Sequence, residues 1–300
     1  MTSLLNYPWK RFFKGLYDEA SEADIFSRAA QVAFYFAFSL FPLLFFLVSL
    51  FGLILESTTV LKAELFEYLR QIMPWSAFDL VRKTVDEITE SSSTGKLTVG
   101  LAVTLWSASA GIDTVRSALN AIYKLRETRP WWRTKLHSLA LTLVLILLIL
   151  LVLSVVFYGW QMVQLGLAGM GLRVSSPLVL VSIQWVTVLL LMLFACEVFY
   201  NLVPDFKRRV WLWVTPGSII AILLWLLMTG GFRTYLSFFN SYNRAYGSLG
   251  AVIILMLWLY LTGVALLVGG VINAVHDAII SEKESGKETD IKLEETSKDY

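Results

Sequence analysis

Three polar residues, Asp113, Arg116 and Asn120, interrupt an otherwise apolar part of the sequence at positions i, i+3 and i+7. This spacing places them on one face of a helix, where the carboxylate and the guanidinium can pair. A charge near the middle of a bilayer costs about 2.5–3.5 kcal/mol on insertion scales, so such residues usually face protein and a partner. We therefore predict one of two roles for this face: the polar lining of a substrate path or proton relay, or a structural ion pair.

A second polar pair, Glu197 and Asn201, has i, i+4 spacing near the end of another apolar segment. It is a further candidate for a substrate path, and the alternative is a structural pair close to water, because Pro204 follows soon after. Tyr246 belongs to a short connection rich in tyrosine and asparagine and is a third candidate. Its alternative role is in an aromatic belt, since tyrosines gather where a span meets the membrane surface.

The motifs of soluble catalysis are missing from the sequence. Gly247-Ser248-Leu249-Gly250 lacks the spacing of a nucleophile elbow. Gly95-Lys96-Leu97 is no phosphate-binding loop, because the first glycine and the Ser/Thr of that motif are absent. His137 and His276 lack the i, i+4 partner of a helical zinc site, and Cys196, the single cysteine, cannot form an internal disulfide. We predict a protein that is not an enzyme and that has no metal site and no other cofactor.

The elements that must position these residues are membrane-spanning helices. Of the 300 residues, 57% are hydrophobic and 16% are charged, where soluble chains have about 45–50% and about 25%. A helix needs about 20 mainly apolar residues to cross a bilayer. Six segments of 27, 16, 35, 23, 23 and 31 residues contain no Asp, Glu, Lys or Arg: 29–55, 97–112, 138–172, 174–196, 210–232 and 245–275. This composition excludes a soluble enzyme, a secreted disulfide scaffold and a disordered protein.

We predict an all-α fold, a polytopic bundle of six transmembrane helices over residues 29–277. The second helix is expected to continue beyond its short apolar run to Tyr123. Pro42 lies inside the first span, and Pro216 with Gly217 lies in the fifth. Membrane helices tolerate proline where neighbours satisfy the freed carbonyl, so we expect helix kinks at these positions.

Three segments outside the spans complete the predicted organisation. Residues 1–28 form a cytoplasmic amphipathic helix that lies in the membrane interface, because one of its faces is apolar: Trp9, Phe12, Phe13, Leu16, Tyr17 and Ala20. Residues 56–96 carry two helical stripes separated by Pro74, which predicts an extracytoplasmic helical hairpin over one mouth of the bundle or two helices on the head groups. Residues 278–300 are highly charged and are expected to form a disordered cytoplasmic tail.

The distribution of basic residues predicts the orientation of the chain. With six spans and the N-terminus inside, 16 of the 25 Lys and Arg residues lie on the cytoplasmic side, 8 lie outside, and Arg116 lies within the second helix. Cytoplasmic loops are richer in Lys and Arg, so both termini are expected in the cytoplasm. The net charge of +2 indicates no nucleic-acid partner. Membrane lipids and a lipid or small-molecule substrate are the expected partners, and a homo-oligomer remains open.

The order of several short motifs resembles the YihY/BrkB-like family of bacterial inner-membrane proteins, once described as ribonuclease BN. The resemblance covers about residues 25–277 and rests on these motifs: Ala33-Phe34-Tyr35, Ser39-Leu40-Phe41-Pro42-Leu43-Leu44, Trp106-Ser107-Ala108-Ser109-Ala110-Gly111, Ala118-Leu119-Asn120-Ala121-Ile122-Tyr123, Pro216-Gly217-Ser218, Trp225, Tyr246-Gly247-Ser248-Leu249-Gly250-Ala251, Trp258-Leu259-Tyr260 and Asn273-Ala274. It adds Asn273 to the candidate path residues. One departure is Val271, where the family pattern leads us to expect an acid.

The resemblance implies a six-span fold, a location in the bacterial plasma membrane and a link to virulence in some members. It favours a transporter or translocator of a lipid or another envelope component. A non-transporting membrane scaffold in envelope integrity is the alternative. A membrane-associated ribonuclease is disfavoured, because metal-assisted hydrolysis needs clustered carboxylates or histidines in an aqueous cleft, and the sequence offers neither.

Overall fold

The computed structural model of the chain describes residues 8–54, 66–67, 70, 82, 94–169, 177–207, 211–238 and 248–298. Within these ranges every extended element is an α-helix and no strand occurs. The seven helices are α1 (Trp9–Glu22), α2 (Ile25–Ile54), α5 (Thr94–Ile122), α6 (Trp131–Gly169), α7 (Pro177–Leu202), α8 (Pro216–Phe238) and α10 (Ser248–Lys298). The predicted all-α class is therefore confirmed.

Among the described residues, four helical segments are long and apolar enough to cross a membrane: Trp131–Gly159, Val181–Leu202, Pro216–Leu236 and Val252–Glu282. A shorter apolar segment, Ile25–Leu40, lies in α2. The protein is thus a multi-pass membrane protein, and the count of six spans stays a prediction. The expected hairpin over 56–96 falls almost wholly outside the described residues, as does Tyr246.

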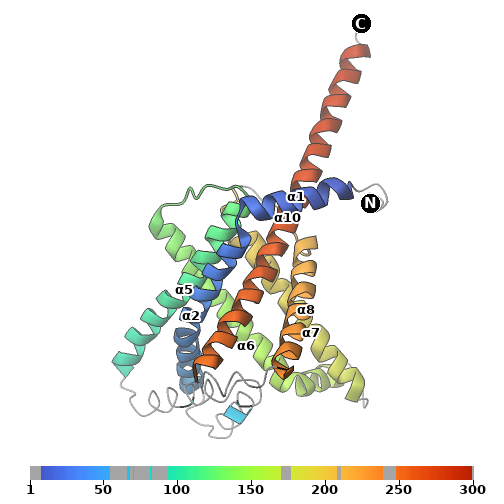
Figure 1. Cartoon of the computed structure of the whole chain (residues 1–300). Helices are drawn as coiled ribbons and strands as arrows, with labels where there is room; N and C mark the ends of the chain where they lie inside the picture. Colours follow the sequence, from blue (N-terminus) through green and yellow to red (C-terminus); the bar gives the residue numbers. More distant parts are fainter. Residues whose placement is uncertain are drawn as a thin grey trace.

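The helices close into a ring. Around this ring the order is α2, α10, α8, α7, α6 and α5, and α5 packs against α2 again. A contact between α5 and α10 crosses the ring. Helix α1 lies across α10 at the end from which the last part of α10 projects (Figure 1). We call this end, where α5 and α7 finish and α6 and α8 begin, the α1 end.

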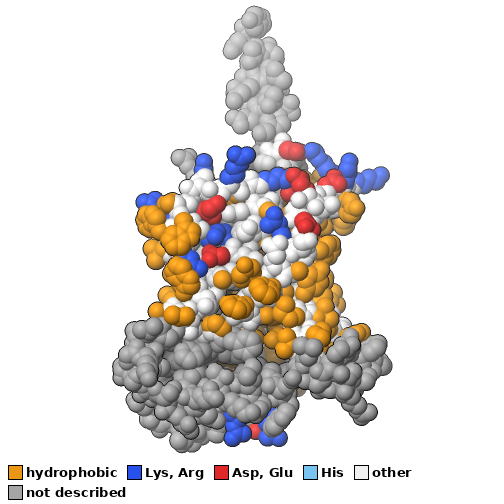
Figure 2. Space-filling view, turned by 60° about the vertical axis from the view of Figure 1, so that its left-hand side comes forward, with side chains coloured by type: hydrophobic (Ala, Val, Ile, Leu, Met, Phe, Trp, Pro, Cys, Tyr) orange, Lys and Arg blue, Asp and Glu red, His pale blue; other side chains and the backbone are white. Residues whose placement is uncertain are grey.

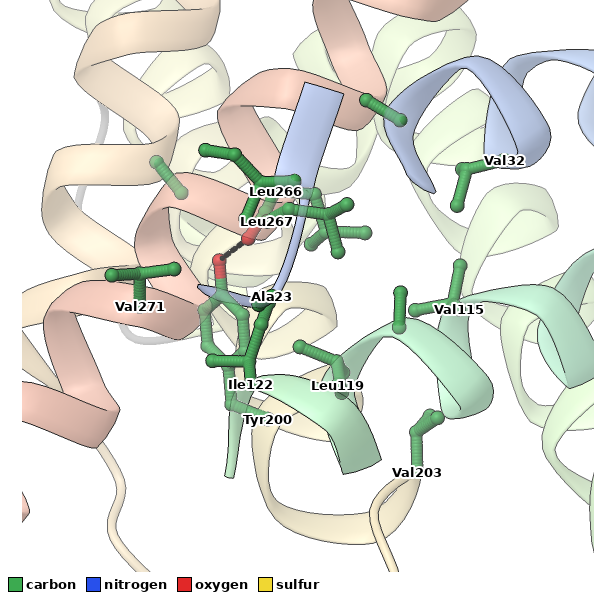
Figure 3. Packing of buried hydrophobic residues seen from close by; sticks show 14 of the residues in the cluster. Ala23, Val32, Val115, Leu119, Ile122, Tyr200, Val203, Leu266, Leu267 and Val271 are labelled. Carbon is green, nitrogen blue, oxygen red and sulfur yellow. Dashed lines mark hydrogen bonds between the residues drawn. The ribbon is translucent and has the colours of Figure 1, made fainter. Parts of the chain in front are cut away.

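Packing is densest at the α1 end. The buried hydrophobic cluster includes Ala23 and Val32, the last turns of α5 with Leu119 and Ile122, and Tyr200 of α7. Figure 3 shows Ala23, Leu119 and Ile122 close to Tyr200, whose hydroxyl donates a hydrogen bond of 2.7 Å to the Leu266 carbonyl oxygen. Where the helix ends would otherwise be exposed to water, burial of this apolar surface is the main force that stabilises their contacts.

The other half of the described bundle is far less buried. In α8 the buried side chains end at Ile222, and in α7 they begin only at Val188. In α6 they run from Thr134 to Ile146, and among the later residues of this helix whose burial is described only Gly159 is buried. Hydrophobic side chains are exposed along these helices, which suits a lipid environment. On the face drawn in Figure 2, hydrophobic side chains form a belt below the charged residues of the α1 end.

Two helix boundaries differ from the predicted ones, the start of α8 and the end of α10. Pro216 is the first residue of α8 and Gly217 the second, so they begin this helix instead of kinking it. The helix thus starts later than the fifth span predicted at about 211–232. Proline suits this position because the first helical N–H needs no partner. Pro42 lies inside α2, as predicted. Helix α10 continues to Lys298, through most of the segment for which the sequence predicts disorder.

Candidate functional site

The polar residues singled out in the sequence lie in two separate clusters, both at the α1 end. The first, the charge network, connects α5, the loop before α6, the start of α6 and the loop after α7. Its members are Asp113, Arg116, Asn120, Glu127, Thr128, Arg129, Lys135, Ser138 and Asp205. The second, the α7–α8 junction, consists of Glu197, Asn201, Thr215, Gly217 and Asn273.

Asp113 stands at the centre of the first part of the charge network. Its Oδ1 lies 2.7 Å from Arg116 Nη1 and accepts a 2.5 Å hydrogen bond from the Ser138 hydroxyl. Its Oδ2 lies 3.0 Å from Lys135 Nζ. The Lys135 ammonium also sits 4.5 Å from the centre of the Trp106 ring, a cation–π contact. Asp113 therefore joins α5 to the first two turns of α6.

Glu127, in the loop between α5 and α6, continues the network. Arg116 Nε lies 3.2 Å from its Oε2, and Asn120 Nδ2 donates a 3.3 Å hydrogen bond to the same oxygen. Arg129 Nε and Nη2 donate to its two oxygens at 2.7 and 3.1 Å, a bidentate pair. Hydrogen bonding to Glu127 raises the pKa of Arg129 above its ordinary value. It outweighs burial, which by itself would lower this pKa.

Asp205 attaches the loop after α7 to the same network. Its Oδ2 accepts hydrogen bonds from the N–H and the hydroxyl of Thr128, at 2.7 and 2.8 Å, and its Oδ1 lies 3.3 Å from Arg129 Nε. Its own N–H donates to Asn120 Oδ1 at 2.9 Å. Burial alone would raise the pKa of Asp205, but the two Thr128 bonds and the Arg129 charge outweigh it and lower the pKa below its ordinary value.

The charge network is electrically balanced and partly shielded from water. Its three carboxylates face three basic groups, and the six charged side chains are between 10% and 29% exposed. Each carboxylate has at least two partners. Such an arrangement can hold the ends of α5, α6 and α7 together, and it must be broken if these ends are to move apart.

Glu197, at the α7–α8 junction, is compensated in a different way. The residue is only 1% exposed. Its Oε1 accepts hydrogen bonds from the N–H and the hydroxyl of Thr215 at 2.7 and 3.0 Å, and its Oε2 accepts one from Asn201 Nδ2 at 2.9 Å. No basic group is among its hydrogen-bond partners in the described residues. The carboxylate instead lies at the start of α8, where the helix dipole favours negative charge.

Thr215 and Asn273 tie this helix start to α10. The Thr215 hydroxyl accepts a 3.3 Å hydrogen bond from the Ser218 N–H, which makes Thr215 the N-cap of α8. The Asn273 amide donates to the same hydroxyl at 3.0 Å and accepts from the Gly217 N–H at 2.8 Å. Three helices, α7, α8 and α10, therefore meet at one buried set of hydrogen bonds.

Glycine is required at position 217 by this contact. A Cβ there would overlap the Gly269 carbonyl oxygen and the Asn273 amide. A Cβ at Gly269 would in turn overlap the Tyr200 hydroxyl. Close approach of helix backbones through glycine is common in membrane bundles, and here it sets how near α8 comes to α10.

The sequence predicted the pairs but not their partners. The structure brings together Asp113, Arg116 and Asn120 as expected, and it adds Asn273 to Glu197 and Asn201. Their partners include residues to which the sequence pattern assigned no role: Glu127, Lys135, Ser138, Asp205 and Thr215. A usable signal was Glu127, the one acid among five basic residues in 124–137. Within the described part of the chain, no group of three or more His, Cys, Asp or Glu residues could hold a metal ion.

Comparison with known proteins adds two findings. The family model described as virulence factor BrkB matches residues 16–292. The ribonuclease-like protein YfkH of Bacillus subtilis (strain 168) is 30% identical over 264 residues, which cover 88% of this chain and 94% of that protein. No solved structure gives a significant match.

Proposed function

The chain belongs to the BrkB family, and on that premise we propose that it is an integral protein of the bacterial plasma membrane that translocates a lipid or another envelope component. In this proposal the charge network is the cytoplasmic gate, closed in the conformation described above. The substrate reaches the ring of helices from the lipid or from the outer side.

The unequal burial of the two halves supports this proposal. At the α1 end, the hydrophobic cluster, the charge network and the α7–α8 junction all hold the helices together. Towards the opposite end, α7 and α8 have no buried described residue before Val188 or after Ile222. Transporters alternate between conformations closed on one side and open on the other by moving groups of helices against each other. A balanced charge network across three chain segments is a bistable contact of the kind such a movement needs.

A membrane scaffold is the second candidate, and one observation favours it. Asp113, Arg116 and Asn120 all have partners within the chain, which suits a purely structural role. Under this alternative the protein supports envelope integrity through a partner protein, and the network never opens.

We do not extend the ribonuclease-like name of the relative to this chain and propose a protein without catalytic activity. The acids that come together, Asp113, Glu127 and Asp205, are each held by basic partners. The proposed partners are membrane lipids and a lipid or small-molecule substrate, and no nucleic acid. A homo-oligomer remains compatible with this function.

Transport is tested with the purified protein in vesicles that contain fluorescent phosphatidylglycerol or phosphatidylethanolamine. Dithionite destroys the fluorescence of lipids in the outer leaflet, so translocation appears as loss beyond the outer half. We expect faster loss with the protein than in empty vesicles for at least one lipid. If vesicles with the protein and empty vesicles give equal rates for both lipids, and also for a fluorescent soluble envelope precursor, the scaffold is favoured.

Orientation is tested in whole cells, in a Cys196→Ala background. We place both termini in the cytoplasm because of the 16 to 8 distribution of basic residues. Cysteines introduced singly at positions 130 and 208 should resist an impermeant thiol reagent, and one at position 92 should react. Labelling at position 130 from outside would contradict the proposed topology.

A further inference from the structure

Helix α1 divides its apolar side into two sectors. In the first, Phe12, Leu16 and Ala20 pack against the buried cluster. Gly15 lies so close to α10 that a Cβ there would stand 3.2 Å from a Val275 methyl group. This sector fixes α1 across α10 at the α1 end (Figure 1).

The second sector turns away from the protein. It holds Trp9, Phe13 and Tyr17, spaced at i, i+4 and i+8, whose residues are 47%, 63% and 74% exposed. The rings of Trp9 and Phe13 stack with centres 6.1 Å apart. Aromatic side chains on a helix parallel to the membrane enter the boundary between head groups and acyl chains. The same helix is thus held by the protein on one side and offers aromatic rings on the other.

Two lysines flank the exposed aromatic sector. Lys10 and Lys14 are one turn apart and exposed. The other charged residues of α1 mostly have protein partners: Arg11 pairs with Glu282 at 2.5 Å, and Glu19 and Glu22 lie 3.0 and 2.9 Å from Lys124 Nζ.

Neither lysine makes an ion pair with an acid in the described parts of the chain, and this includes Asp18, one turn after Lys14. Figure 2 shows that charged side chains of the α1 end lie just beyond the hydrophobic belt. In a bilayer this level coincides with the head groups, so the two ammonium groups stand at the depth of the lipid phosphates.

We infer that Trp9, Lys10, Phe13, Lys14 and Tyr17 form a docking surface for anionic phospholipid. The rings enter the head-group boundary and the two ammonium groups bind phosphate oxygens. Because Glu19 and Glu22 hold the loop after α5 through Lys124, lipid bound at this surface also fixes α1 against the closed end of the bundle. This inference does not depend on transport.

The experiment uses the full chain in vesicles of phosphatidylcholine, with a fluorophore on Ser21→Cys in the Cys196→Ala background. Two samples are compared, one with a trace of phosphatidylglycerol and one with a trace of phosphatidylcholine that carry the same quencher on an acyl chain. The loss of fluorescence in each sample measures the local concentration of that lipid near residue 21. We expect phosphatidylglycerol to quench several-fold more, because each lysine near an anionic head group contributes about fivefold in affinity. Equal quenching by the two lipids would overturn the inference.

Two sets of variants separate this surface from general charge attraction. Lys10→Gln with Lys14→Gln should bring the ratio of the two quenching efficiencies close to one. Arg126→Gln with Lys207→Gln removes the same charge from exposed positions at the same end and should leave the ratio unchanged. An equal fall in both double variants would overturn the inference. Phe13→Ser with Tyr17→Ser should lower quenching by both lipids, and unchanged quenching would rule out insertion of the rings.

Discussion

The charge network and the α7–α8 junction both hold carboxylates at the α1 end, yet they neutralise them by different means. Asp113, Glu127 and Asp205 are partly exposed and face basic groups. Glu197 is buried and faces only N–H and O–H donors at the start of a helix. The network is redundant, since each carboxylate has several partners. At the junction, by contrast, one carboxylate satisfies donors from Asn201 on its own helix and from Thr215 at the start of α8.

This difference indicates at which cluster the helix ends can move apart. Partly hydrated ion pairs exchange partners at small cost, because water and neighbouring charges replace a lost contact. A buried carboxylate that loses its donors has no such replacement. We therefore expect the junction to behave as a fixed pivot and the network as the part that opens.

Removing the carboxylate of Glu197 should have the largest effect. Glu197→Ala leaves the Thr215 N–H and hydroxyl without their acceptor and weakens the hold on Asn201, and each unsatisfied buried donor costs about 1–3 kcal/mol. We expect loss of about 3 kcal/mol or more of stability, measured as the yield of monodisperse protein and its Tm in detergent. Glu197→Gln, which retains one acceptor oxygen, should be intermediate. Cys196→Ala is the control, and a Tm for Glu197→Ala equal to that of the control would refute the pivot.

A methyl group at position 217 should have the next largest effect. Gly217→Ala forces α8 away from the Gly269 carbonyl, because a rigid backbone atom cannot give way, and overpacking of this kind costs about 1–3 kcal/mol. Gly230→Ala is a matched control in the same helix, since a Cβ there meets nothing within 4 Å. Its Tm should stay unchanged or rise slightly, as helical Gly→Ala changes do. Similar Tm values for the two variants would show that the contact between α8 and α10 is loose.

Charge removal in the network should cost less, about 1 kcal/mol, because every neighbour keeps another partner. After Asp113→Asn, Arg116 still has Glu127, and Lys135 still has the Trp106 ring. Replacing Arg116 by Gln as well should restore part of the lost stability, since the network is then balanced again, with two carboxylates and two basic groups. A double-mutant cycle on Tm measures this coupling.

The same cycle, measured on lipid translocation, tests whether the network is a gate or only a structural contact of a transporting protein. If the network is a gate, the double variant regains stability but not transport. If it is scaffolding, stability and function recover together. Full activity of the double variant would remove Asp113 and Arg116 from the proposed gate.

The pH dependence of Asp205 should be the smallest effect. Its folded-state pKa is lowered, so its contribution to stability is present above the unfolded pKa of about 3.9 and is lost as the pH falls through the folded-state value. Between pH 7 and pH 3 the wild type should therefore lose slightly more in Tm than Asp205→Asn does. Parallel curves for the two proteins would mean that the Thr128 contacts do not favour the ionised form.

Much of the fold follows from local pattern, and the site follows only in part. Apolar runs and i, i+3 or i, i+4 spacing depend on neighbouring residues, which is why the helices and the Asp113–Arg116 pair were predictable. The partners Asp205 and Thr215 lie far along the chain from Asn120 and Glu197, and no periodicity connects them. The start of α8 at Pro216 was also missed, because the apolar run extends past the N-cap and hides it.

The ring order of the helices has a consequence for how the protein is made. From α5 to α10 each described helix packs beside the next one along the chain, so these contacts form as the chain emerges from the ribosome. Helix α2 is different, because one of its two ring neighbours is α10, the last to be synthesised. Until α10 inserts, the face of α2 that carries Ala29 has no protein against it where Gly263 will pack. Because α10 is the last helix to be made, the ring is completed only at the end of translation. Contacts between distant parts of a chain also form slowly. Until then, the insertion machinery or a chaperone has to shield that face.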